Sequence, residues 1–193
     1  MSRIVAKAKL ATVITITGAA LVILALGIMI TGALGLFTDQ ESVGSNSFST
    51  GTLDLSANPA SALVTFSNMA PGDSVTGQLT LTNSGTLQLR YAMTTSATND
   101  DAKNLRDQLQ LTIKTLGTDC NTFDGIQLYT GTLASGVIGD AAQGAQAGDR
   151  TLAAQGSESL CFRVQLPLST GNSFQNAATT ATFTFQAEQT ANN

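Results

Sequence analysis

Residues 75–93 read VTGQLTLTNSGTLQLRYAM and contain two runs in which apolar and polar side chains alternate. The apolar positions are Val75, Leu79, Leu81, Leu87, Leu89, Tyr91 and Met93. Between the runs lies Asn83-Ser84-Gly85, whose residue types are common in tight turns. Alternation with a period of two is typical of strands that bury one face. The stretch therefore predicts two β-strands joined by a turn.

The same alternation recurs along the rest of the chain. Further runs contain Leu53, Leu55 and Ala57; Ala62, Val64 and Phe66; Leu109, Leu111 and Ile113; Leu160, Phe162, Val164 and Leu166; and Phe183 and Phe185. Turn-forming stretches separate them, such as Pro71-Gly72-Asp73 and Ser169-Thr170-Gly171-Asn172. Short strands between turns predict an all-β fold, a jelly-roll-like antiparallel sandwich over residues 48–193.

Two segments depart from the strand pattern. Residues 99–109 read NDDAKNLRDQL and predict one short helix, with Asp100 or Asp101 as its N-cap and Arg106 near its end. Residues 131–157 are rich in Gly, Ala and Gln, with weak strand character only near residues 136–138. They predict a long surface loop.

The N-terminus has the layout of a secretory signal. Three basic residues, Arg3, Lys7 and Lys9, precede an uncharged and mostly apolar run over residues 10–38. A basic start followed by an apolar segment is typical of signal peptides. The run is also long enough to span a bilayer as a helix, so a retained membrane anchor is the alternative.

The end of this run predicts the cleavage site. Ala33 and Gly35 place small residues where signal peptidase requires them, so we expect removal of residues 1–35 and a mature chain that begins at Leu36. Cleavage removes three of the 9 Lys and Arg residues, which leaves 6 against 13 Asp and Glu residues and a formal charge of −7. Nucleic-acid binding requires clustered basic residues, so we exclude it.

Cys120 and Cys161 are the two cysteines of the chain. An even number of cysteines in an exported domain predicts a disulfide. Closing a loop of this length stabilises a domain by about 2–4 kcal/mol. The alternative is a pair of buried free thiols, because cysteine is among the residues most often buried.

The sequence offers few groups for catalysis. It contains no histidine, which excludes the usual serine and cysteine triads and zinc sites built on histidine. Asp100 and Asp101 are the only adjacent acidic residues, and we interpret them as a solvated helix start. The acidic residues also lack the spacing of a calcium-binding loop. We therefore expect no catalytic residue, no metal or other cofactor, and no small-molecule substrate.

The aromatic residues permit a second interpretation. Most phenylalanines in the strand runs occupy core-facing positions, which ordinary packing explains. An alternative function is a lectin-like binding domain, monomeric or membrane-anchored at the cell surface, with Tyr91 or Tyr129 as exposed rings.

Several motifs carry a resemblance to a known family. They are Phe37-Thr38-Asp39, FSTGTLDL at residues 48–55, NMAPGD at residues 68–73 and TNSGTL at residues 82–87. In these motifs the chain resembles the TasA/camelysin family of secreted bacterial biofilm-matrix fibre proteins and their archaeal bundling-pilus relatives. The resemblance weakens through residues 99–157. It implies a jelly-roll subunit that is exported, processed by a dedicated signal peptidase, and located in the extracellular matrix or at the cell surface.

The resemblance also implies polymerisation by donor-strand complementation, in which one subunit's N-terminal segment completes the sheet of the next. Residues 36–47 suit this role because they carry apolar side chains at Leu36, Phe37 and Val43, and a flexible Gly44-Ser45-Asn46-Ser47 stretch follows. Strand addition to an exposed sheet edge is a common binding mode. A head-to-tail contact that does not close produces a filament, so we expect a homo-oligomer of this kind. A disordered tail is the alternative.

Some members of this family are described as metalloproteases. Zinc proteases of the commonest kind hold the metal through the two histidines of an HExxH motif. Because the chain has no histidine, we expect a structural protein rather than an enzyme.

Overall fold

The computed structural model describes residues 47, 49–61, 63–65 and 67–191. Ser49–Asn193 forms one compact unit, distinct from Met1–Phe48. The predicted signal peptide, its cleavage site at Ala33, Gly35 and Leu36, and the donor-segment residues Leu36, Phe37 and Val43 lie outside the described residues. The described fold is therefore that of the Ser49–Asn193 unit.

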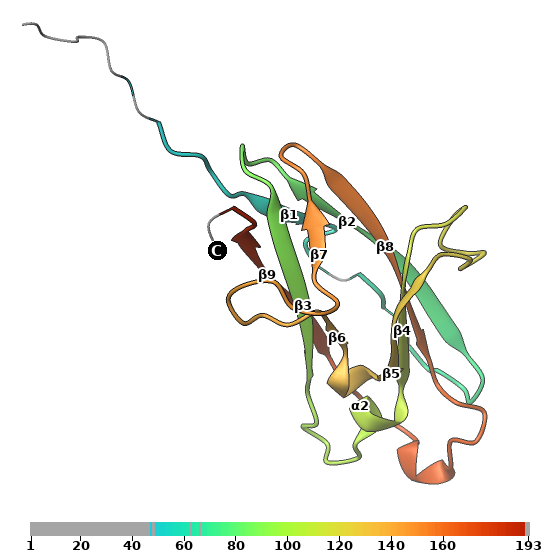
Figure 1. Cartoon of the computed structure of the whole chain (residues 1–193). Helices are drawn as coiled ribbons and strands as arrows, with labels where there is room; N and C mark the ends of the chain where they lie inside the picture. Colours follow the sequence, from blue (N-terminus) through green and yellow to red (C-terminus); the bar gives the residue numbers. More distant parts are fainter. Residues whose placement is uncertain (1–46, 48, 62, 66, 192–193) are drawn as a thin grey trace, which may run out of the picture. The chain divides into compact units, whose positions relative to one another are not determined.

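The regular secondary structure of this unit consists mostly of strands (Figure 1). They are β1 (Leu55–Asn58), β2 (Ser74–Asn83), β3 (Leu89–Ala97), β4 (Gln110–Thr115), β5 (Gln127–Thr132), β6 (Val137–Ile138), β7 (Arg150–Leu152), β8 (Ser157–Gln165) and β9 (Ala181–Gln189). The helical elements are short: α2 (Leu105–Gln108) and the 3-10 turns η1 (Leu133–Ser135) and η2 (Asn172–Phe174). The all-β prediction is confirmed.

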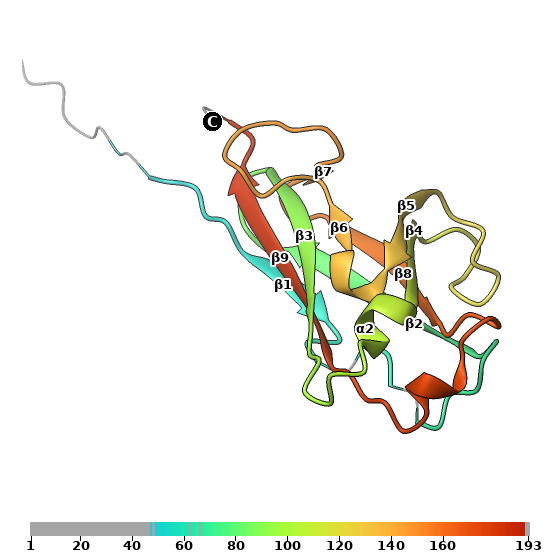
Figure 2. The same cartoon turned by 90° about the horizontal axis from the view of Figure 1, so that it is seen from below.

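The strands form two antiparallel sheets that face each other (Figure 2). One is five-stranded in the order β1-β2-β8-β4-β5. The other is centred on β3, which pairs with β9 along its whole length, from Leu89 opposite Gln189 to Ala97 opposite Ala181. The short strands β6 and β7 pair with separate parts of β3 and share its other edge. The arrangement is an antiparallel sandwich.

The core lies between the sheets, where the apolar positions of the alternating runs meet. Leu81 on β2, Met93 on β3, Ile113 on β4 and Phe162 on β8 are fully buried. Each such side chain stabilises a fold by about 1.5–3 kcal/mol relative to an exposed one. The alternation read from the sequence therefore places the core correctly on these four strands.

One predicted strand is absent. Residues 63–65 are not part of a strand, although Ala62, Val64 and Phe66 alternate in the sequence; Ala62 and Phe66 themselves lie outside the described residues. Gly77 on β2 gives the physical reason. A Cβ atom there would lie 2.5 Å from the Leu63 carbonyl oxygen and 2.8 Å from Val64 Cγ1. The segment thus packs onto the inner face of β2, where Gly77 leaves room for it, instead of pairing along a strand edge.

The predicted helix is one turn long, and its predicted cap is wrong. The N-cap of α2 is Asn104, in the left-handed conformation at φ 58°. Asp101 instead accepts hydrogen bonds from the backbone N–H groups of Lys103 (3.0 Å) and Ala178 (2.8 Å). It therefore ties this segment to the chain that leads into β9.

Among the described residues, no helix has the length and hydropathy needed to cross a membrane.

The region predicted as a long loop contains ordered elements. It includes η1, β6 and β7, which leaves residues 139–149 as the loop itself. Two carboxylates hold this loop: Asp149 accepts hydrogen bonds from the N–H groups of Asp140 and Gln146, and Glu188 on β9 accepts one from Gly144. The N–H donors keep the pKa of Asp149 below its ordinary value. The loop is therefore anchored on the sheet that contains β9.

Candidate assembly groove

An apolar groove of about 630 Å³ opens between the two sheets on the side of β1 and β9. Its described lining consists of Ala57, Pro59, Ala60, Ser61, Leu63, Val64, Thr65, Met69, Val75, Leu79, Leu109, Leu133, Val164, Thr179, Thr180, Ala181, Thr182, Phe183 and Phe185. One wall is formed by β9 and the residues before it, and the other by the end of β1 and the segment that follows. Core residues such as Leu79 and Val164 form the floor.

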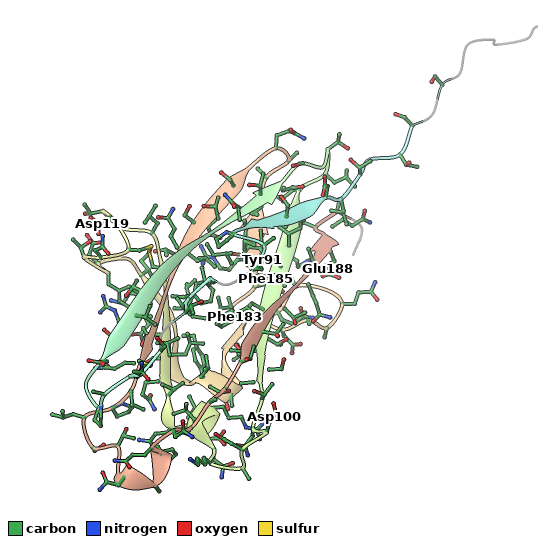
Figure 3. The ribbon with its side chains drawn as sticks, turned by 180° about the vertical axis from the view of Figure 1, so that it is seen from behind. Tyr91, Asp100, Asp119, Phe183, Phe185 and Glu188 are labelled. Carbon is green, nitrogen blue, oxygen red and sulfur yellow. A yellow bond between two sulfur atoms is a disulfide. The ribbon has the colours of Figure 1, made fainter. Side chains whose placement is uncertain are left out.

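The strand β9 combines apolar side chains with an unpaired edge. Phe183 and Phe185 point toward the five-stranded sheet, and their rings contact Phe162 and Tyr91 at centroid distances of 4.9 and 6.1 Å (Figure 3). Both are only half-buried, whereas Tyr91 on β3 is 1% exposed. Within the described part of the chain, no strand pairs with the edge of β9 that faces away from β3. An added strand would satisfy that edge and cover the rings.

The opposite wall of the groove also contains a partly unpaired strand edge. β1 pairs only with Thr80–Asn83 of β2. The first part of β2, from Ser74 to Leu79, pairs with β8 on one edge and has no strand on its other edge in the described residues. The irregular segment with Leu63 and Val64 packs on the inner face of this part of β2, at Gly77. The sandwich is therefore complete on the β8, β4 and β3 side and incomplete along the groove.

The chemistry of the groove favours apolar contacts over catalysis. The described residues that line it include no Asp, Glu, Lys or Arg. No group of three or more His, Cys, Asp or Glu side chains that could hold a metal ion occurs in residues 47, 49–61, 63–65 and 67–191. What the groove can supply is an apolar surface and the backbone N–H and C=O groups of a strand edge, which are the two requirements of strand addition.

A polar network links the two sheets through β3, β7 and β8. The Tyr91 hydroxyl donates a hydrogen bond to Glu158 Oε2 at 2.7 Å, and Arg150 Nε donates to both carboxylate oxygens at 3.0 Å. Burial and the neighbouring carboxylate raise the pKa of Tyr91 above its ordinary value. These contacts join β3 and β7 of one sheet to β8 of the other. Tyr91 is therefore unavailable as an exposed glycan-binding ring. Tyr129, the other ring named for the lectin-like alternative, is half-buried, and its hydroxyl donates a hydrogen bond to Thr132 O at 2.9 Å.

Cys120 and Cys161 form a disulfide in the structure, with their Cα atoms 5.2 Å apart. It fixes the loop between β4 and β5 to the outer face of β8. Phe123 of that loop lies under two cations, with Arg163 Cζ 3.9 Å and Lys114 Nζ 4.9 Å from the ring centroid. The disulfide is on the face of β8 opposite to Phe162 and hence away from the groove. Its formation in the secreted protein stays a prediction.

Sequence reasoning missed the groove itself. The Phe183 and Phe185 alternation was recognised, but a period of two is the same for a strand in the middle of a core and for one beside a vacancy. Leu63, Met69 and Thr179 lie in irregular segments without any pattern. The proposed occupants Leu36, Phe37 and Val43 are outside the described residues, so the structure does not place them.

Comparisons with known proteins give one family and no close relative. The family described as "Camelysin metallo-endopeptidase" matches residues 7–193. The curated proteins contain no match. Two solved structures are similar to this chain only at a level too low to assign a fold or a function. The ASH/PapD-like domain 7 of human CEP192 is 14% identical, with 80% of this chain and 99% of that chain covered and a TM-score of 0.30. The sporulation control protein Spo0M of Bacillus subtilis is 14% identical, with 73% and 47% covered and a TM-score of 0.27.

Proposed function

Because the chain belongs to the camelysin family, which includes the TasA-like proteins, we propose that it is a secreted, non-enzymatic subunit of an extracellular filament. In this proposal subunits join by donor-strand complementation, with residues 36–47 of one copy bound in the groove of the next. The family points to a secreted, biofilm-related protein. The filament and its assembly by donor-strand complementation are what we propose beyond the family assignment.

The observation that carries the proposal is the uncharged groove beside the unpaired edge of β9. An open strand edge next to half-buried apolar rings promotes uncontrolled association unless a specific partner covers it. A segment that adds as a strand gains hydrogen bonds along that edge and buries its apolar side chains on the groove floor. The groove thus has the properties of an acceptor site.

The length of the N-terminal segment fits this acceptor. Residues 36–47 comprise twelve residues, and β9 comprises nine. Fully extended, twelve residues span roughly 40 Å, which covers a nine-residue strand with several residues left as a tether. Phe37 and Val43 share one face of an extended strand and Leu36 lies on the other, so either face offers an apolar side chain for burial. Residues 44–47 supply the flexible connection.

Composition and the lining of the groove support a non-catalytic role. The chain has no histidine, and the groove is lined by uncharged residues. The proposed role uses the groove for binding another copy and requires no reacting group. Homogeneous protein should therefore show no proteolysis that a chelator inhibits.

Export is part of the proposal, because a donor strand needs a free N-terminus. Cleavage after Gly35 makes Leu36 the first residue of the donor segment. N-terminal sequencing of protein recovered from the native host should begin at Leu36. Recovery of chains that retain Met1 in the membrane would support the anchored alternative instead.

Deletion of residues 36–47 tests the proposed assembly. Protein that begins at Leu36 should form filaments visible by electron microscopy, whereas protein that begins at Phe48 should remain folded and monomeric. A matched control carries residues 36–47 in scrambled order, so that length and charge are unchanged, and it should assemble poorly. Normal filaments from the truncated protein would show that another surface joins the subunits.

A further inference from the structure

We propose that residues 139–148 are an insertion that closes the second edge of the β3 sheet to pairing with another copy of the chain. β9 forms one edge of this sheet, and β6 and β7 together form the other (Figure 1). The inference goes beyond the proposed function, because it concerns the edge opposite to β9 and does not involve residues 36–47.

The register of β6 and β7 shows that they are two parts of one strand. Ile138 lies opposite Met93, so in an uninterrupted antiparallel strand the second residue after it would lie opposite Tyr91. The residue that occupies this place is Arg150, and β7 continues in the same register. The chain between the two strands is therefore ten residues longer than an uninterrupted strand requires. Residues 139–148 account for this difference.

The insertion closes on itself and is bonded to the sheet. Gly139 and Gly148 have positive φ values of 65° and 89°, and a Cβ atom on Gly148 would lie 3.3 Å from Gly139 N. Gly144 N–H donates to Glu188 on β9 at 2.9 Å, and Asp149 accepts hydrogen bonds from two further N–H groups of the insertion. Ordering a loop of this length costs conformational entropy. The contacts that offset this cost indicate a built feature of the fold.

The backbone groups at this edge show what the insertion prevents. Thr95 N–H donates to Gly136 O at 2.8 Å, so alternate residue pairs from there along β3 exchange hydrogen bonds. Val137 and Thr151 belong to the intervening pairs, and their N–H and C=O groups therefore point away from β3. Within the described residues, no strand pairs with these groups. Because the insertion leaves and re-enters the strand between them, a second copy finds no continuous row of free backbone groups.

Removal of the insertion would make this edge continuous. Asp149 would follow Ile138 directly and lie opposite Ala92, which joins β6 and β7 into one strand. Val137, an apolar residue that is 44% exposed, would then stand in an uninterrupted edge strand. Such edges pair readily with other chains. Two copies can pair antiparallel through the same edge of each, which produces a two-fold symmetric dimer.

The rest of the domain should tolerate the deletion. The insertion lies beside Ala92 and Arg90 on the outer face of β3, and these residues are 3% and 8% exposed. Ala92 is a small side chain, so its exposure loses little burial. Arg90 keeps its ion pair with Glu188, in which Nε is 2.8 Å from Oε1. The variant that lacks residues 139–148 should therefore fold.

Deletion of residues 139–148 from the full mature chain tests the proposal. The parent carries residues 36–47 in scrambled order, so that the assembly proposed above does not contribute. Sedimentation over a concentration series should show that the deletion strengthens self-association by about tenfold or more. A further substitution in the deletion variant, Thr151→Pro, removes an N–H group that points away from β3 and should restore the parent's behaviour. An unchanged association state of the folded deletion variant would overturn the proposal.

Two matched variants separate the interruption from the sequence of the insertion. Replacing residues 140–147 by glycine and serine keeps the interruption and should leave self-association as in the parent; stronger association would show that interruption alone does not close the edge. Deleting residues 139–149 removes one residue more, which turns Leu152 outward. Its melting temperature should be well below that of the 139–148 deletion. If the 139–148 deletion unfolds, or is no more stable than the longer one, β6 and β7 are not parts of one strand and the inference is wrong.

Discussion

The two phenylalanines Phe162 and Phe183 contact each other across the sandwich, yet their surroundings differ. Phe162 on β8 has strands on both sides, β2 and β4, and is fully buried. Phe183 on β9 has β3 on one side and the groove on the other, and is half-buried. The same alternating pattern produces both strands. Among the described residues, β8 therefore has a strand on each side, whereas β9 has a strand on one side only.

Truncating these two rings should give the largest difference in stability. In mature chains with a scrambled donor segment, Phe162→Ala should lower the free energy of unfolding by about 3–5 kcal/mol. Phe183→Ala removes a half-buried ring and should cost roughly 1–2 kcal/mol. Urea unfolding measures both. Equal costs would mean that the groove is closed in the isolated subunit, which would remove the basis for an acceptor site.

The sequence predicts well the strands that have a neighbouring strand on both edges. Leu79, Leu111 and Phe162 alternate with polar residues on strands that have two neighbours, so local pattern and tertiary environment agree. The strand β7 was missed, since it has three residues and two of them, Arg150 and Thr151, are polar. The weak strand character near residues 136–138 coincides with β6. Three residues cannot display a period.

The incomplete side is where sequence reasoning fails, and the causes are specific contacts. Val64 has the spacing of a strand residue, but Gly77 leaves a space on β2 that draws Leu63 and Val64 onto its inner face. Asn104 caps α2 in a left-handed conformation, while Asp101, one of the two acids predicted as caps, accepts hydrogen bonds from the N–H groups of Lys103 and Ala178. Such contacts join residues distant in sequence, and no local pattern records them.

Removing the disulfide should have the next largest effect on the stability of the domain. The loop closed by Cys120 and Cys161 spans a separation of 41 residues. The paired substitutions Cys120→Ala and Cys161→Ala should destabilise the domain by about 2–4 kcal/mol. Filament formation at low temperature should persist, because the disulfide lies on the face of β8 away from the groove. If the folded variant formed no filaments, the region of the disulfide would also contribute to assembly.

The oxidation state itself can be measured directly. Intact-mass analysis of the secreted, non-reduced chain should show a mass two hydrogen atoms lower than that of the reduced chain. Two thiols that can be alkylated in the native protein would contradict the disulfide.

Acidification should have a smaller effect, confined to loops. Hydrogen bonds from N–H groups hold the pKa of Asp101, Asp119 and Asp149 below the ordinary value of 3.8, and bonds from Thr118 do the same for Asp124. A depressed pKa in the folded state means that the unfolded chain takes up protons first as pH falls. The stability contributed by these groups is therefore complete above about pH 5 and is lost progressively below pH ~4.

A series of melting temperatures between pH 7 and pH 2 checks this expectation. The melting temperature should change little from pH 7 to 5 and decrease below pH 4. Asp119→Asn should reduce the decrease, since it removes one of the titrating groups, whereas Asp100→Asn serves as a control on an aspartate without the same loop contacts. A melting temperature independent of pH down to 2 would contradict the assigned role of these carboxylates.

The most direct test of the central claim is binding of the isolated donor segment to an empty groove. A synthetic peptide of residues 36–47 is added to mature chains with a scrambled donor segment, and amide hydrogen exchange is followed for each strand. The proposed function predicts that exchange slows along β9, from Ala181 to Ala187, and that the peptide in scrambled order has no such effect. Unchanged exchange at β9, in a preparation whose wild-type form polymerises, would contradict the claim that the groove accepts this segment.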